Sequence, residues 1–315
     1  MATHASAPPL HAHYGALRLW GLALLAVAAG VIIAGFWNFH LVDGFGRDVV
    51  AGRTIGDTRA LAGSFAERGL GFGFLFAAVA GVAATFTACN CVVFAMLPGL
   101  ACSPGEQRGR AESPWWALGI FVTGVVLVSA AYGAYIGGLG PDGVAALNAR
   151  GARLAQAQMV FTAIGAVMLL WGVAEAGLLD RIARRLPSGA RGALGSAAVK
   201  AGALGVLVGL FAVGRPFPVF REFLSYAASA ENPLYGAAVM ITQGLGQIVV
   251  MIALFALIVW LWAPRLQAWA LSRPHQPRLL GAFALLAGGA FFVFYWGLAF
   301  AFDIGRWGFK LGWYG

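Results

Sequence analysis

Long apolar blocks are the feature of this sequence that most limits how it can fold. A helix needs ~20 mostly apolar residues to cross the ~30 Å hydrocarbon core of a membrane. Blocks of at least that length lie at roughly 16–37, 70–100, 115–138, 154–179, 199–226, 234–263 and 277–302. Only 10% of the residues are charged, whereas soluble domains carry roughly 25%. The sequence therefore predicts an all-α integral membrane protein with seven transmembrane helices, which excludes soluble enzymes and DNA-binding proteins.

The predicted helices divide the chain into an N-terminal anchor and two sets of three. A disordered tail precedes the anchor, a long loop follows it, a basic loop separates the two sets, and a short tail ends the chain. The ranges of these segments, in order, are 1–15, 16–37, 38–69, 70–179, 180–198, 199–302 and 303–315. Because each set has an odd number of helices, the second set is inverted relative to the first. We therefore expect two inverted three-helix repeats.

Basic residues predict the orientation of the chain. Loops rich in Arg and Lys remain on the cytoplasmic side of a membrane. The two most basic loops contain Arg181, Arg184, Arg185 and Arg191, and Arg265 and Arg273 with Arg278 just beyond. The N-terminus is then cytoplasmic, and the 38–69 loop and the C-terminal tail lie outside. This rule also explains the net charge of +9, so we expect contact with membrane lipid and no nucleic-acid partner.

Each set of three helices opens with an irregular tract. Proline removes a helix donor and clashes with the preceding turn, and such breaks survive in membranes only where protein or a water-filled cavity covers the freed groups. We therefore expect both tracts to be broken or kinked. The residues that mark them are Cys89, Asn90, Cys91 and Pro98 in the first tract, and Arg215, Pro216, Phe217 and Pro218 in the second.

The two tracts within inverted repeats resemble the CcdA/DsbD transmembrane family of thiol-disulfide electron carriers, which includes proteins of cytochrome c biogenesis. The resemblance covers about residues 70–302 and includes the small-residue stretch from Ala238 to Gly246. The Cys-Asn-Cys tract and the extra N-terminal helix are more specifically similar to the MauF branch, a membrane protein of methylamine utilisation.

Membership of this family would imply a bacterial inner-membrane protein that passes electrons from a cytoplasmic thioredoxin-like donor to a periplasmic client. Family members carry one reactive cysteine in each repeat. Here Asn90-Cys91 aligns with Pro216-Phe217, so the second cysteine is absent. The usual disulfide between two helices cannot form, and whether Cys89 replaces the missing thiol stays open.

Cys89 and Cys91 would point ~200° apart on a regular helix, so a disulfide between them requires a helix break. In the reactive hypothesis Cys91 is the functional thiol, Cys89 is its partner, and Arg215 lowers the thiol pKa. Two alternatives remain: both cysteines pack as small apolar residues, or they bind a soft metal ion. No resident metal or cofactor is expected.

Three further residues complete the predicted site. Cys102, near the cytoplasmic end of its span, could relay electrons or be an ordinary boundary cysteine. Gln243 and Gln247 lie one turn apart and could hydrogen-bond the broken tracts, although a role in joining helices is favoured.

Three function hypotheses follow. The first is maturation of a periplasmic redox protein, such as methylamine dehydrogenase, by thiol-disulfide exchange. The second is a redox-inactive membrane scaffold of the same fold that binds another membrane subunit. The third is a permease for small solutes or metals, because transporters also use inverted repeats and broken helices.

Overall fold

The computed structural model describes residues 15–87, 90, 114–179, 185, 196–273 and 275–314, and every regular element in them is a helix. Six helices are long and apolar enough to cross a membrane, and one bent pair could form a further span. The six are α2 (Ala16–Gly35), α6 (Phe65–Thr85), α8 (Pro114–Asn148), α9 (Arg150–Glu175), α14 (Pro233–Ser272) and α15 (His275–Phe292), which the π-helix η2 (Val293–Ala299) continues. The bent pair is α12 (Ala197–Gly214) and α13 (Pro218–Ala228). The all-α membrane class is confirmed.

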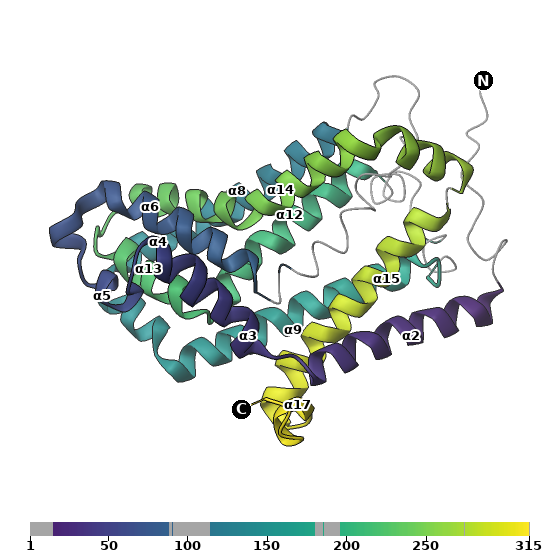
Figure 1. Cartoon of the computed structure of the whole chain (residues 1–315), viewed down its shortest axis with the longest axis horizontal. Coiled ribbons are helices and arrows are strands. Elements are labelled where there is room, and N and C mark those ends of the chain that lie inside the picture. The colour runs from purple at the N-terminus through teal and green to yellow at the C-terminus, as the bar shows by residue number, and fades with distance from the viewer. Residues whose placement is uncertain are drawn as a thin grey trace.

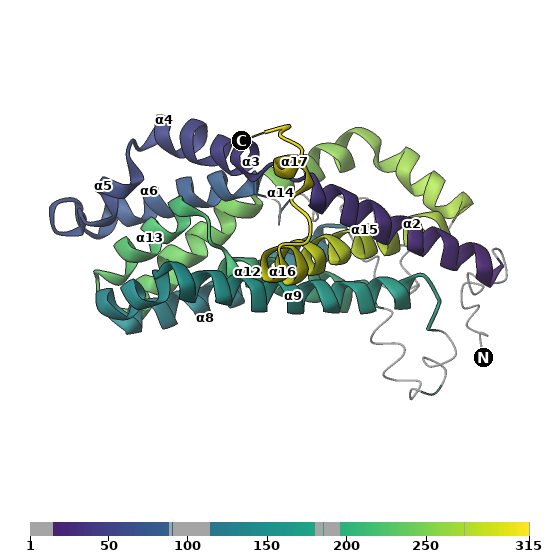
Figure 2. The same cartoon turned by 90° about the horizontal axis from the view of Figure 1, so that it is seen from below.

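The segment expected as a loop at 38–69 is largely helical. It contains α3 (Phe39–Gly44), the π-helix η1 (Phe45–Ala51), α4 (Gly52–Thr54) and α5 (Thr58–Ala62), and α6 already begins at Phe65. Local capping explains two of these starts, because Asn38 accepts a hydrogen bond from the Leu41 amide and Asp57 accepts one from the Arg59 amide. Figure 2 shows α3 and α4 on the opposite side of the bundle from α8 and α9.

Helix α8 also extends beyond the span expected from the sequence. It continues past residue 138 to Asn148 and is kinked at Gly140, whose φ of 69° is rarely adopted by other residues. Pro141 follows directly and removes a backbone donor there. The C-terminal tail carries two short helices, α16 (Phe300–Phe302) and α17 (Trp307–Lys310).

Two helix pairs run parallel, as their close approaches show. In the first pair Gly73 of α6 lies against Tyr235 of α14, and further along Gly81 lies against the Gln243 carbonyl. In the second pair, Ile120 and Val128 of α8 lie against Gly202 and Gly209 of α12. Small residues permit these close backbone approaches, which is how helices associate tightly within a membrane.

Two other pairs run antiparallel. Gly133 of α8 lies against Met240 of α14, whereas Gly137, further along α8, lies against Asn232. In the same way Gly165 of α9 lies against Phe292 of α15, and Gly172 against Leu286. The first three pairs share α8 and α14, and α12 connects them to the pair of α9 and α15. Figure 1 shows α8, α12 and α14 running side by side.

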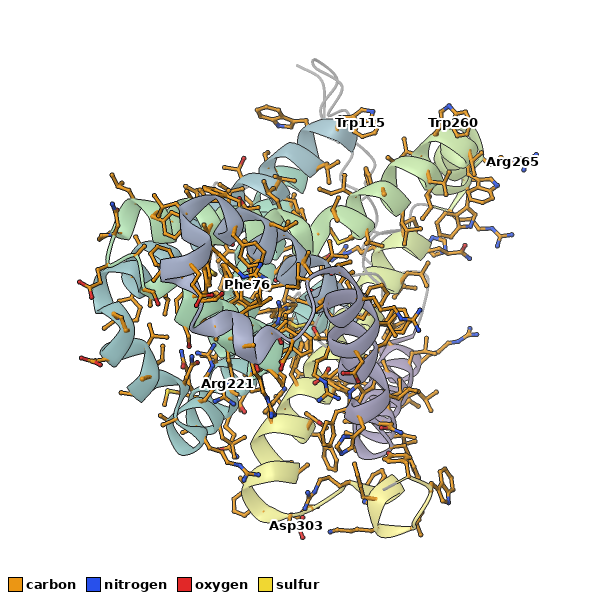
Figure 3. All side chains as sticks on the ribbon, turned by 60° about the vertical axis from the view of Figure 1, so that its left-hand side comes forward. Phe76, Trp115, Arg221, Trp260, Arg265 and Asp303 are labelled. Atoms are coloured by element: carbon orange, nitrogen blue, oxygen red, sulfur yellow. The ribbon has the colours of Figure 1, made fainter. Side chains whose placement is uncertain are left out.

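Ion pairs between side chains join three helices at one end of the bundle. Glu175 at the end of α9 pairs with Lys200 of α12 at 2.6 Å and with Arg278 of α15 at 3.5 Å. Leu19 of α2 packs with Leu279 near the start of α15. We call this the Glu175 end. Figure 3 shows Trp115, Trp260 and Arg265 gathered at one end of the molecule, far from Asp303.

Replacing Gly289 with valine should destabilise the protein. A Cβ atom there would lie 2.7 Å from the Gly165 carbonyl oxygen, so α9 and α15 must separate. We expect a loss of about 1–3 kcal/mol, measured by thermal unfolding of the detergent-purified protein. Gly21→Val is the matched control, since nothing lies within 4 Å of the corresponding Cβ. Equal stability of the two variants would contradict the observed packing.

Candidate functional site

The chain breaks sharply between α12 and α13. Helix α12 ends at Gly214, α13 begins at Pro218, and their axes differ by 84°. Pro216 and Pro218 explain the break locally: the residues before them are pushed to extended conformations, and Pro218 occupies a favourable first helical position. Arg215 and Phe217 accordingly have ψ angles of 117° and 128°. The break lies in the tract where the sequence predicts one.

Gln247 is the centre of a buried hydrogen-bond network around this break. Its Oε1 accepts a hydrogen bond of 2.8 Å from Nη1 of Arg215. Its Nε2 donates to Oδ1 of Asn90 at 3.2 Å and to the Val208 carbonyl at 3.3 Å. One amide side chain therefore joins Asn90 of the first tract to Arg215 of the second.

The backbone of Gln247 extends the network to α6. Thr85, the last residue of α6, donates its hydroxyl to the Gln247 carbonyl at 3.0 Å. Asn90 in turn donates its Nδ2 to the Ala84 carbonyl at 2.8 Å. The end of α6 and the break after α12 are thus fixed to the same point of α14.

The network lies deep in the molecule. Arg215, Gln247 and Asn90 are 1%, 2% and 4% exposed. Gln247 is near the middle of Pro233–Trp262, the apolar part of α14 that is long enough to span a membrane. Charged groups at such depth are costly and are candidates for function.

Gln243 lies one turn before Gln247 and is fully buried. Its Nε2 is 3.5 Å from Oε1 of Gln247, while its own Oε1 has no hydrogen-bond partner in the described part of the chain. Gln243 therefore adds a second buried polar side chain near the middle of α14.

The structure brings together four residues predicted from sequence, Asn90, Arg215, Gln243 and Gln247. Pro216, Phe217 and Pro218 form the break beside them, and Phe217 is buried in the apolar core. The remaining predicted site residues, Cys89, Cys91, Pro98 and Cys102, lie outside the described residues. In the described part, no three metal-ligating side chains cluster.

The segment after α2 covers the break, which the sequence did not indicate. Gly46 of η1 approaches the Ala83 carbonyl closely, and a Cβ atom at Gly46 would lie 3.4 Å from the Phe217 ring. Asp43 of α3 is close enough for Arg215 to affect its ionisation. The sequence signal is weak, because Gly46 near Asp43 can be recognised as a point of close approach only once the fold is known.

Burial raises the pKa of Asp43 to about 6, while the positive charges of Arg215 and Arg47 act in the opposite direction. By contrast, Arg47 hydrogen-bonds the exposed Asp48 and holds its pKa below the usual range. Asp43 is therefore an acid near the break that titrates close to neutral pH.

Comparison of the chain with protein-family models, curated protein sequences and solved structures finds no match in any of the three. The functional argument therefore depends on the residues themselves.

Gln247→Leu should destabilise the protein more than a comparable change elsewhere. Leucine removes one acceptor of Arg215 and the donor to Asn90, and removing a hydrogen-bond partner from a buried polar group costs about 1–3 kcal/mol. Thermal unfolding in detergent measures the loss. Gln158→Leu, at a half-buried position of α9 outside the network, is the control. The network has no structural importance if both variants unfold at the same temperature.

Asp43→Asn should flatten the dependence of stability on pH. Since the folded-state pKa of about 6 lies above the ordinary value of 3.8, ionisation of Asp43 favours unfolding. Its stabilising contribution is complete below 3.8 and is lost as the pH rises through about 6. Melting temperatures across this range should fall less in Asp43→Asn than in the wild type. Asp48→Asn, whose folded-state pKa is shifted down, should not reproduce the effect.

Proposed function

We propose that this protein is a membrane thiol-disulfide carrier of the CcdA/DsbD type that supports maturation of a periplasmic redox protein. The observation that supports this best is the hydrogen bonding of one glutamine, Gln247, to Asn90 and Arg215. Asn90 separates the two cysteines of the first tract in the sequence. A buried guanidinium in the same network is the kind of cation that stabilises a thiolate.

The proposal includes two inverted three-helix repeats, α6–α8–α9 and α12–α14–α15. The directions of the helix pairs support it. Helix α6 runs parallel to α14, as α12 does to α8, while α8 and α14 are antiparallel, as are α9 and α15. Each helix of the first set therefore runs opposite to its counterpart in the second, which an inverted repeat requires.

We further propose that the protein lies in a bacterial inner membrane with the Glu175 end in the cytoplasm. The starts of α2, α12 and α15 and the end of α9 meet there. The positive-inside rule assigns the adjoining basic loops to the same side. The N-terminus would then be cytoplasmic and the C-terminus periplasmic, with the bent pair as the seventh span.

In the proposed reaction the thiolate of Cys91 attacks a disulfide of the client, and Cys89 resolves the mixed disulfide. The client gains two electrons and two protons, one proton from the Cys89 thiol and one from water, and a Cys89–Cys91 disulfide forms. A cytoplasmic thioredoxin-like dithiol reduces that disulfide and becomes oxidised itself. Arg215 assists by favouring the thiolate over the thiol.

A second candidate is a scaffold of the same fold without redox activity. Phe217 favours it, since this residue occupies the position aligned with the second family cysteine and is only 2% exposed within an apolar cluster. An aromatic ring at this position replaces the thiol through which family members exchange electrons between the two repeats. Such a protein would bind another membrane subunit or the maturation machinery.

Differential alkylation in native membranes distinguishes the two candidates. Under the carrier proposal, Cys89 and Cys91 change from disulfide to thiol when a cytoplasmic thiol reductant is supplied. In a Cys89→Ser, Cys102→Ser background, Arg215→Ala should slow alkylation of Cys91 at neutral pH by about tenfold for each unit by which the thiol pKa rises.

Arg215→Lys should keep most of that alkylation rate because it retains the charge, and Arg150→Ala, at an exposed position of α9, is the matched control. Cysteines that stay reduced under both conditions, together with equal rates in the Arg215 variants, would support the scaffold instead.

A further inference from the structure

Arg153 is a second fully buried arginine in the bundle. It lies in the first turn of α9, a helix long and apolar enough to span a membrane, and is 1% exposed. Its Nη1 donates hydrogen bonds to the Tyr132 hydroxyl at 3.2 Å and to Oε1 of Gln156 at 3.1 Å. These two contacts fix the guanidinium from one side.

The other edge of this guanidinium, formed by Nε and Nη2, is also buried. Nε and Nη2 of Arg153 make no hydrogen bond to any described residue, and no carboxylate in the described part of the chain pairs with it. The N–H groups of Nε and Nη2 point in the same direction and match the spacing of two oxygens. Arg47 shows the same edge in use, with its Nε and Nη2 bound to the two oxygens of Asp48 at 2.7 and 2.9 Å.

A second guanidinium and an aromatic ring lie near Arg153. The guanidinium carbons of Arg153 and Arg215 each lie 5.8 Å from the centre of the Phe220 ring, so they are separated by no more than twice that distance. An aromatic face attracts cations through its quadrupole but carries no net charge. Phe220 therefore supplies no counter-ion to Arg153.

We propose that the Nε/Nη2 edge of Arg153 binds an oxyanion, a carboxylate or phosphate group that presents two oxygens to it. Tyr132 and Gln156 orient the guanidinium, and the Phe220 ring of α13 lies beside it. Because Arg153 is only 1% exposed, entry of the oxyanion requires local movement of the helices packed around it. This site is independent of the thiol chemistry proposed above.

Two sources could supply the same chemistry, free phosphate or the phosphate of an anionic lipid headgroup. For the first, the full-length protein in detergent is titrated with inorganic phosphate at constant ionic strength, with chloride as the balancing anion, and its thermal unfolding is followed. For the second, nanodiscs of phosphatidylglycerol are compared with nanodiscs of phosphatidylcholine.

Phosphate or phosphatidylglycerol should stabilise the wild type in a saturable manner. Arg153→Lys should weaken the phosphate affinity by about tenfold, because an ammonium keeps the charge but lacks the paired donors. Tyr132→Phe, which removes one orienting contact and leaves the core intact, should weaken it by about threefold. Arg150→Gln, at an exposed position of the same helix, should bind as the wild type does.

The response in detergent identifies a free oxyanion, and a response confined to nanodiscs identifies the lipid headgroup. The proposal is overturned if neither phosphate nor phosphatidylglycerol stabilises the protein beyond its chloride or phosphatidylcholine reference. Equal affinities in the wild type, Arg153→Lys and Tyr132→Phe would also overturn it.

Discussion

The hydrogen bond between Arg215 and Gln247 is the interaction on which the centre of the structure depends. A guanidinium remains charged in proteins, so at this depth it must find polar partners inside the bundle. Gln247 supplies an acceptor at 2.8 Å, and its amide donor binds Asn90. The break at Pro216 permits this hydrogen bonding because the chain turns directly after Arg215. A continuous helix would keep Arg215 on its regular surface.

Close helix packing holds this polar centre in place. Within lipid there is no hydrophobic drive to bring apolar helices together, so contact between small residues and interhelical hydrogen bonds must do so. Gly81 and Gly246 let α6 and α14 approach at backbone distance, and Thr85 then reaches the Gln247 carbonyl. The same helices that pack through glycine therefore also set the position of the network. A bulky residue at Gly81 would affect the hydrogen bonds of Gln247 as well as the packing.

Much of the fold follows from the sequence because membrane helices have one dominant signal, the length of an apolar block. The break between Gly214 and Pro218 follows from proline chemistry. Hydrogen bonding of Gln247 to the tracts is one of two roles that the sequence leaves open, and the structure shows it. The helices at 38–69 carry no such signal, since they are short, and only the caps Asn38 and Asp57 mark their starts. The burial of Arg153 could not be predicted because this residue lies near the predicted end of a membrane span, where an arginine is expected to face the membrane–water interface. Its burial depends on Tyr132 and Phe220, which are distant in sequence.

The geometry of α13 explains why the two proposed chemistries meet around one ring. Its 11 residues span ~17 Å, too short to cross a membrane, and the 84° turn directs it across the bundle. Its start is tied to the network through Arg215, and its middle is tied to α8 because Arg221 donates to the Asn148 carbonyl. These two attachments place the centre of the Phe220 ring 5.8 Å from the guanidinium carbons of both Arg215 and Arg153. The two sites that we propose, one for a thiolate near Arg215 and one for an oxyanion at the paired donors of Arg153, are therefore neighbours at this short helix.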